Sequence, residues 1–114
     1  MAFVLKQSDS YTWPVSFDLP IDGGRHERQS FDGEFRRLSQ SRIREIGAQI
    51  ESGEITDGEL AAEVLVGWSG VTDDAGKDVP FSHGALSQLL DVPMLATAIV
   101  TAYFGSLQGA KRKN

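Results

Sequence analysis

The fold is decided by residues 13–35, which read WPVSFDLPIDGGRHERQSFDGEF. Apolar residues alternate with polar residues or proline from Trp13 to Leu19, and this period of two is typical of a strand with one buried face. Pro14 places that strand at a sheet edge or near a strand start, because proline cannot donate a hydrogen bond to a neighbouring strand. The sequence therefore begins with a predicted edge strand.

A chain reversal follows in residues 20–24, where proline, aspartate and two glycines form a strong turn signal. Residues 25–35 are largely polar, but Phe31, Gly33 and Phe35 share one face at a spacing of two. We expect these residues to return as a second, more exposed strand. The opening segment is thus a predicted β-hairpin.

Two helices are predicted after the hairpin. Ser39 can cap a helix that begins at residue 40, and Gly53 is a natural helix end. Thr56 and Glu59 have the spacing of a capping box, in which each side chain satisfies the other residue's backbone N–H. The buried face predicted for this second helix consists of Leu60, Val64, Leu65 and Trp68.

Two more helices are predicted near the C-terminus. Residues 70–80 contain turn formers and predict a short hairpin or an ordered loop, after which Ser82 can cap a leucine-bearing helix. Pro93 suits the first turn of a final helix that runs to Leu107. That helix is apolar almost all round, so it is either central to its own core or shared with a partner.

The predicted fold class is α+β, with an N-terminal β-hairpin followed by about four α-helices, because strands and helices are segregated along the chain. We expect one domain over residues 1–114, without a linker between parts. It divides into a hairpin region at 1–38, a helical region at 39–109 and a frayed basic tail at 110–114.

Composition and motifs argue against an enzyme. There are no cysteines, and the two histidines, His26 and His83, belong to no metal-ligand spacing, so we expect no metal and no cofactor. The sequence lacks a nucleotide-binding glycine motif and a GxSxG nucleophile motif. The apolar stretches are too short for a membrane span, and the N-terminus does not have the pattern of a signal peptide.

Charge is unevenly distributed, with a net charge of −5. Arginines gather between Arg25 and Arg44, and the acidic balance opposes general binding to nucleic-acid phosphates. A small regulatory DNA-binding module that uses this arginine cluster is nevertheless one alternative for the function.

The second half resembles a known family. Residues 68–104 read WSGVTDDAGKDVPFSHGALSQLLDVPMLATAIVTAYF, and the chain closes with KRKN. This order of motifs resembles the tail assembly chaperones of siphophages and related prophages. A looser match reaches back to Trp13 and to residues 35–40, FRRLSQ. No single motif is specific, and the order and spacing of several of them carry the resemblance.

The resemblance implies a non-catalytic protein of the host bacterial cytoplasm. It would bind the tape measure protein, help to recruit tail tube subunits, and be absent from the mature virion. The shorter of two forms related by ribosomal frameshifting would end at Asn114. A small tail-completion or connector protein of the virion is the first alternative, since it would also be compact, acidic and non-catalytic.

Candidate protein-binding residues lie on the final predicted helix, because its apolar surface exceeds what one core face needs. A homo-oligomer is also possible on this ground. The candidate residues are Ile99, Tyr103, Phe104 and Leu107.

Overall fold

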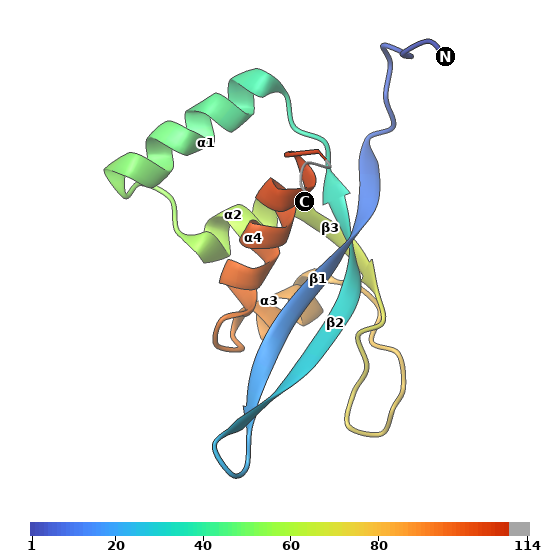
Figure 1. The fold of residues 1–114 in the computed structure, drawn as a ribbon, viewed down its shortest axis with the longest axis vertical. Helices are drawn as coiled ribbons and strands as arrows, with labels where there is room; N and C mark the ends of the chain where they lie inside the picture. The colour runs from blue at the N-terminus through green and yellow to red at the C-terminus, as the bar shows by residue number, and fades with distance from the viewer. Residues whose placement is uncertain (110–114) are drawn as a thin grey trace.

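A computed structural model describes residues 1–109 and confirms the α+β class, with a hairpin, a third strand and four helices (Figure 1). In chain order the elements are β1 (Ser10–Ile21), β2 (Arg25–Arg36), α1 (Gln40–Ser52), α2 (Asp57–Val64), β3 (Leu65–Ser69), α3 (His83–Leu90) and α4 (Leu95–Ser106). The basic tail predicted at 110–114 lies outside the described residues.

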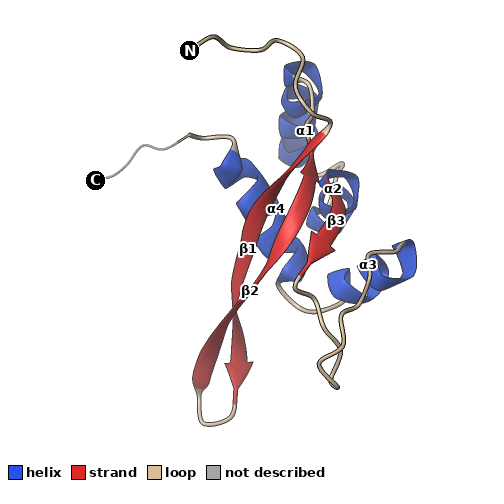
Figure 2. Ribbon diagram, turned by 90° about the vertical axis from the view of Figure 1, so that its right-hand side faces the viewer, coloured by secondary structure: helices blue, strands red, loops and turns tan. Residues whose placement is uncertain are grey.

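The three strands form one antiparallel sheet in the order β1-β2-β3, so β2 is central. Val15 pairs with Phe31, and Tyr11 pairs with Phe35, which places their side chains on the face that α4 covers (Figure 2). The prediction of a more exposed second strand holds only for residues 25–30. Its C-terminal part contributes two buried phenylalanines to the core.

The third strand was not predicted. The helix from Asp57 ends at Val64, and Leu65–Ser69 forms β3, so the predicted helical face through Leu65 and Trp68 was wrong. The central strand offered a free edge, and the branched and aromatic residues of this segment pack well in a sheet. Gly67 also weakens a helix at this point.

The predicted helix starts are confirmed at three places. The side chains of Ser39, Thr56 and Ser82 accept hydrogen bonds from first-turn backbone N–H groups, at 3.1, 3.1 and 3.0 Å. Glu59 completes the capping box through the backbone N–H of Thr56, at 2.9 Å. Helix α1 ends at Gly53, whose φ of 75° lies in the left-handed region that glycine adopts without a Cβ clash.

The final helix begins two residues later than predicted, at Leu95 rather than Pro93. Met94 precedes it with φ 70°, the one non-glycine residue with positive φ among residues 1–109. This backbone conformation breaks the helical path after Pro93. Helix α4 then buries Leu95, Ile99 and Tyr103. It is therefore central to the core, which is one of the two alternatives predicted for it.

Residues 70–81 form an ordered loop, which is one of the two forms predicted for this segment. Thr72 and Asp78 form an isolated β-bridge, and the indole N–H of Trp68 donates to the carbonyl of Val79 at 2.7 Å. The Trp68 ring also meets Phe81 edge-on, with 4.9 Å between ring centroids. Trp68 thus connects this loop to the sheet through one hydrogen bond and one ring contact.

The turn end of the hairpin projects from the body of the protein (Figure 1). Residues 22–24 form the turn, and Ile21 beside it is 39% exposed. Pro14 and Pro20 both lie in β1, which is an edge strand as Pro14 predicted. We call residues 17–29 of this projecting hairpin the arm.

Candidate functional site

Within residues 1–109, no three His, Cys, Asp or Glu side chains lie close enough together to hold a metal ion. No charged side chain in that range is buried. The cavities and exposed apolar side chains of these residues are candidates for contact with a partner.

The predicted binding residues on α4 do not form one exposed surface. Ile99 and Tyr103 are almost completely buried, at 0% and 1% exposure, whereas Phe104 is half-buried and Leu107 is 45% exposed. In this conformation only Phe104 and Leu107 are accessible to a partner. Their role in binding remains a prediction.

Tyr103 has a structural environment. Its ring packs on Phe35 with 5.5 Å between centroids, and its hydroxyl donates to the backbone carbonyl of Arg36 at 3.2 Å. Burial raises the pKa of Tyr103 above its ordinary value of 10.0. The side chain ties α4 to the central strand and leaves no free donor for a ligand.

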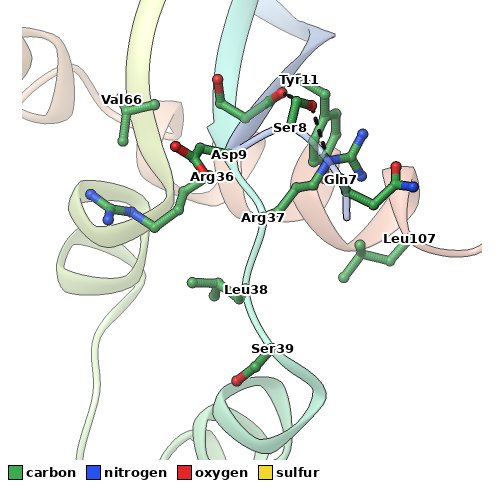
Figure 3. Close-up of a pocket in the computed structure, with 11 residues that line it drawn as sticks. Gln7, Ser8, Asp9, Tyr11, Arg36, Arg37, Leu38, Ser39, Val66 and Leu107 are labelled. Atoms are coloured by element: carbon green, nitrogen blue, oxygen red, sulfur yellow. Dashed lines mark hydrogen bonds between the residues drawn. The ribbon is translucent and has the colours of Figure 1, made fainter. Parts of the chain in front are cut away.

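A broad surface cavity of about 760 Å³ lies where the sheet leads into α1 (Figure 3). We call it the linker groove. Exposed Leu107 lines one part of it, and Leu38 and Val66 contribute apolar surface to another. It is lined by Gln7, Ser8, Asp9, Ser10, Tyr11, Arg36, Arg37, Leu38, Ser39, Val66 and Leu107.

A β-bulge contributes to the linker groove. Glu34 pairs with Gly67 and Phe35 pairs with Leu65, so Val66 is an extra residue in the ladder. Bulges redirect side chains near functional surfaces. Here the extra residue brings a half-buried valine beside the polar lining.

Arg37 has a defined place in the linker groove. Its guanidinium carbon lies 4.8 Å from the centre of the Tyr11 ring, and its Nε donates to the Ser8 hydroxyl at 3.4 Å (Figure 3). A cation over an aromatic face is attracted by the ring quadrupole. Tyr11 and Arg37 thus give one side of the linker groove both aromatic and cationic character.

A second cavity, of about 230 Å³, lies between the arm and the body. We call it the hairpin groove. Arm residues form one wall, and the loop after β3, the end of α3 and the start of α4 form the other. Its apolar lining residues are Phe17, Leu19, Phe31, Val71, Leu89, Val92 and Leu95.

The arginines between residues 25 and 44 are divided among separate places. Arg28 in the arm pairs with Asp18 at 3.3 Å, whereas Arg36 and Arg37 line the linker groove. Arg42 is held by carboxylates between two helices. Arg28 and Arg42 are thus paired with carboxylates, and the structure adds no support to the DNA-binding alternative.

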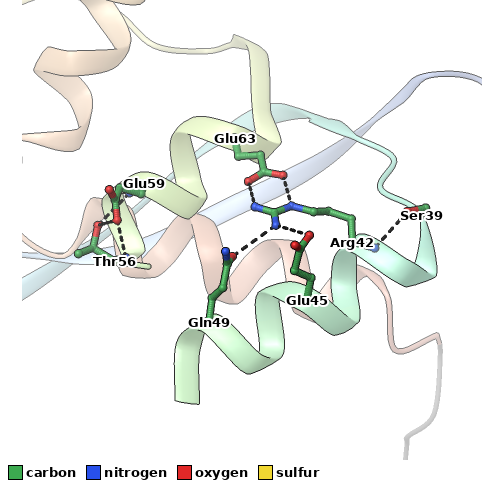
Figure 4. A network of polar contacts seen from close by, with 7 residues as sticks. All are labelled: Ser39, Arg42, Glu45, Gln49, Thr56, Glu59 and Glu63. Atoms are coloured by element: carbon green, nitrogen blue, oxygen red, sulfur yellow. Dashed lines mark hydrogen bonds and ion pairs between the residues drawn. The ribbon is translucent and has the colours of Figure 1, made fainter. Parts of the chain in front are cut away.

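Arg42 joins α1 to α2 (Figure 4). Its guanidinium donates to both carboxylate oxygens of Glu63, at 2.6 and 2.8 Å, and to Glu45 at 2.8 Å. The side chains of Arg42 and Glu63 are 27% and 29% exposed. These hydrogen bonds hold the pKa of the Glu63 carboxyl below its ordinary value of 4.5 and raise that of Arg42. Together with Ile46, which is the only buried residue of α1, this network holds the helix against the rest of the protein.

The Glu63 contact predicts a pH-dependent contribution to stability. Because the pKa is lower in the folded state, the contribution is present above pH 4.5 and is lost as the pH falls through the folded-state pKa. Glu63→Gln should therefore lower the urea midpoint at about pH 7 and lower it much less at about pH 3. Glu51→Gln, at an exposed position of α1, is the control. A pH-independent effect of Glu63→Gln would contradict the prediction.

Sequence reasoning missed the hairpin groove. Its arm residues, Phe17 and Leu19, were predicted as one strand face, but nothing local showed that this face would continue beyond the area that α4 covers. Val92 lies between α3 and α4, outside any regular element. The available signal was the run of alternating apolar residues, which extends to Ile21.

Among the described residues no single helix is long and apolar enough to cross a membrane; α3 and α4 meet the length and composition requirement only as a pair bent by 103°. No protein family, curated protein or solved structure was found to match this chain.

Proposed function

We propose that the protein is a phage tail assembly chaperone that binds the tape measure protein and helps to recruit tail tube subunits, without catalysis. The order of motifs from Trp68 onward is the resemblance behind this proposal. The observation that carries it is the linker groove, an open cavity with accessible apolar side chains on an acidic protein.

The physical requirement for such a chaperone is to cover apolar surface on a long client while remaining soluble. A net charge of −5 favours solubility, and exposed apolar side chains supply the attraction to a client. Leu107 lines the linker groove, and half-buried Phe104 lies three residues before it, in the last turn of α4. The client contact is proposed there, in the host bacterial cytoplasm and not in the mature virion.

Co-expression with the tape measure protein of the same genome tests the function. We expect a complex that is recovered by pull-down and a larger soluble fraction of the client. No complex and no gain in solubility would overturn the proposal. Recovery of the protein at fixed stoichiometry from purified particles would instead support a tail-completion or connector protein.

A matched pair of variants tests the surface. Leu107→Asp should reduce capture of the client, because it places a charge on the apolar contact. Ile50→Asp is the control: Ile50 is 47% exposed, against 45% for Leu107, and it lies in the last turn of α1, away from the linker groove. If both variants captured the client equally well, the client contact would not lie on this surface.

A further inference from the structure

The N-terminal residues carry apolar surface that no other part of residues 1–109 covers. Phe3, Val4 and Leu5 are 77%, 67% and 87% exposed. Together with Ala2 they form four consecutive apolar residues, a pattern that is unfavourable on a surface unless it is used for binding. Figures 1 and 2 show this segment leaving the sheet at the end opposite the arm.

The hairpin groove is an apolar surface of complementary character. Seven of its lining side chains are apolar, and Val92 at its edge is 39% exposed. Ile21, also 39% exposed, continues the arm beyond the cavity. An extended segment presents alternate side chains to opposite sides, so Phe3 and Leu5 can enter one groove together.

The segment cannot reach the groove of its own chain. The backbone is fixed at Asp9, whose carbonyl accepts a hydrogen bond from the N–H of Arg37 at 2.9 Å. Leu5 lies four residues before this point, so its backbone reaches at most about 14 Å from it. The groove residue nearest to Asp9 along the sheet, Phe31, pairs with Val15, which lies six residues further along β1, about 20 Å away. An occupant from this segment must therefore come from another copy.

Charge also favours this pairing. Lys6 is the only charged side chain in residues 1–8 and directly follows the apolar run. Asp91 lies next to Val92, and Asp73 and Asp74 continue the loop from Thr72, which lines the groove. A cation beside the apolar segment thus meets carboxylates beside the apolar groove, in a contact that weakens with salt.

We propose that residues 2–6 of one copy occupy the hairpin groove of a second copy. The two surfaces differ, so the contact is head-to-tail, and each added copy presents a new free groove and a new free segment. Assembly then continues until a ring closes or a filament forms. This inference is independent of the proposed client function, which uses the linker groove.

Sedimentation velocity and light scattering across a concentration series test the proposal. We expect the wild-type mass to rise with concentration above the 12.4 kDa of one chain. The double variant Phe3→Asp, Leu5→Asp and the groove variant Val92→Asp should each remain monomeric, with an association about tenfold weaker or more. These positions are exposed, so circular dichroism should report unchanged folding.

Mixing the two variants gives the decisive result. The segment variant retains a groove, and the groove variant retains a segment, so together they should form a 1:1 dimer that grows no further. Ile21→Asp is a second groove variant if Val92→Asp impairs folding, and Ile50→Asp should assemble like the wild type. A monomeric wild type, undiminished assembly of either variant, or no dimer on mixing would overturn the proposal.

Discussion

Replacing Phe35 with alanine should lower the free energy of unfolding by about 3–5 kcal/mol. Phe35 is fully buried in the central strand, and its ring lies between Tyr11 and Tyr103, with centroid distances of 6.3 and 5.5 Å. Alanine would leave a cavity where the sheet meets α4. Domains of this size are stabilised by about 5–15 kcal/mol, so the loss is a large fraction of the total.

Urea unfolding followed by circular dichroism measures this effect. Ile50→Ala is the control, because Ile50 is 47% exposed and lines neither groove, so its truncation should change the free energy of unfolding by only about 0.5 kcal/mol. A loss below about 1 kcal/mol for Phe35→Ala would contradict the close packing described for the core.

Trp68→Ala should lower the free energy of unfolding by about 3 kcal/mol, because a large, half-buried ring is lost. The ring meets Phe31 and Phe81 edge-on, with centroid distances of 6.4 and 4.9 Å. It also holds the loop through the hydrogen bond to Val79. We therefore expect trypsin to cleave after Lys77, within the loop, faster than in the wild type.

Two further variants separate the contributions. Trp68→Phe keeps most of the ring contact and removes the hydrogen bond, so it should cost about 1 kcal/mol. Trp13→Ala removes the other tryptophan, which is 39% exposed, and should leave cleavage after Lys77 unchanged. If trypsin cleaved the wild type and Trp68→Ala after Lys77 at the same rate, Trp68 would not be the residue that holds the loop.

Local signals predicted most of the fold. The helix caps at Ser39, Thr56 and Ser82 depend on side chains within three residues of the groups they satisfy, and all three are confirmed. The hairpin depends on an equally local turn. β3 could not be predicted in this way, because its formation depends on pairing with β2, about thirty residues earlier in the chain.

The candidate site was less predictable. An all-round apolar helix identifies α4 as important but cannot show which face the sheet covers, and the structure places Ile99 and Tyr103 on that face. Leu107 is exposed because it follows the last turn of α4, beyond the area in contact with β1. The hairpin groove depends on how far the arm extends past the body, which is a property of tertiary packing.

The two prolines of β1 disfavour association of copies of this protein through the free edge of that strand. A free strand edge invites another strand to add to it, and this is a common route to amyloid-like fibrils. Pro14 and Pro20 leave gaps in the row of N–H donors along that edge. Even at high concentrations of the protein, fibril growth from β1 is thus opposed by the backbone itself.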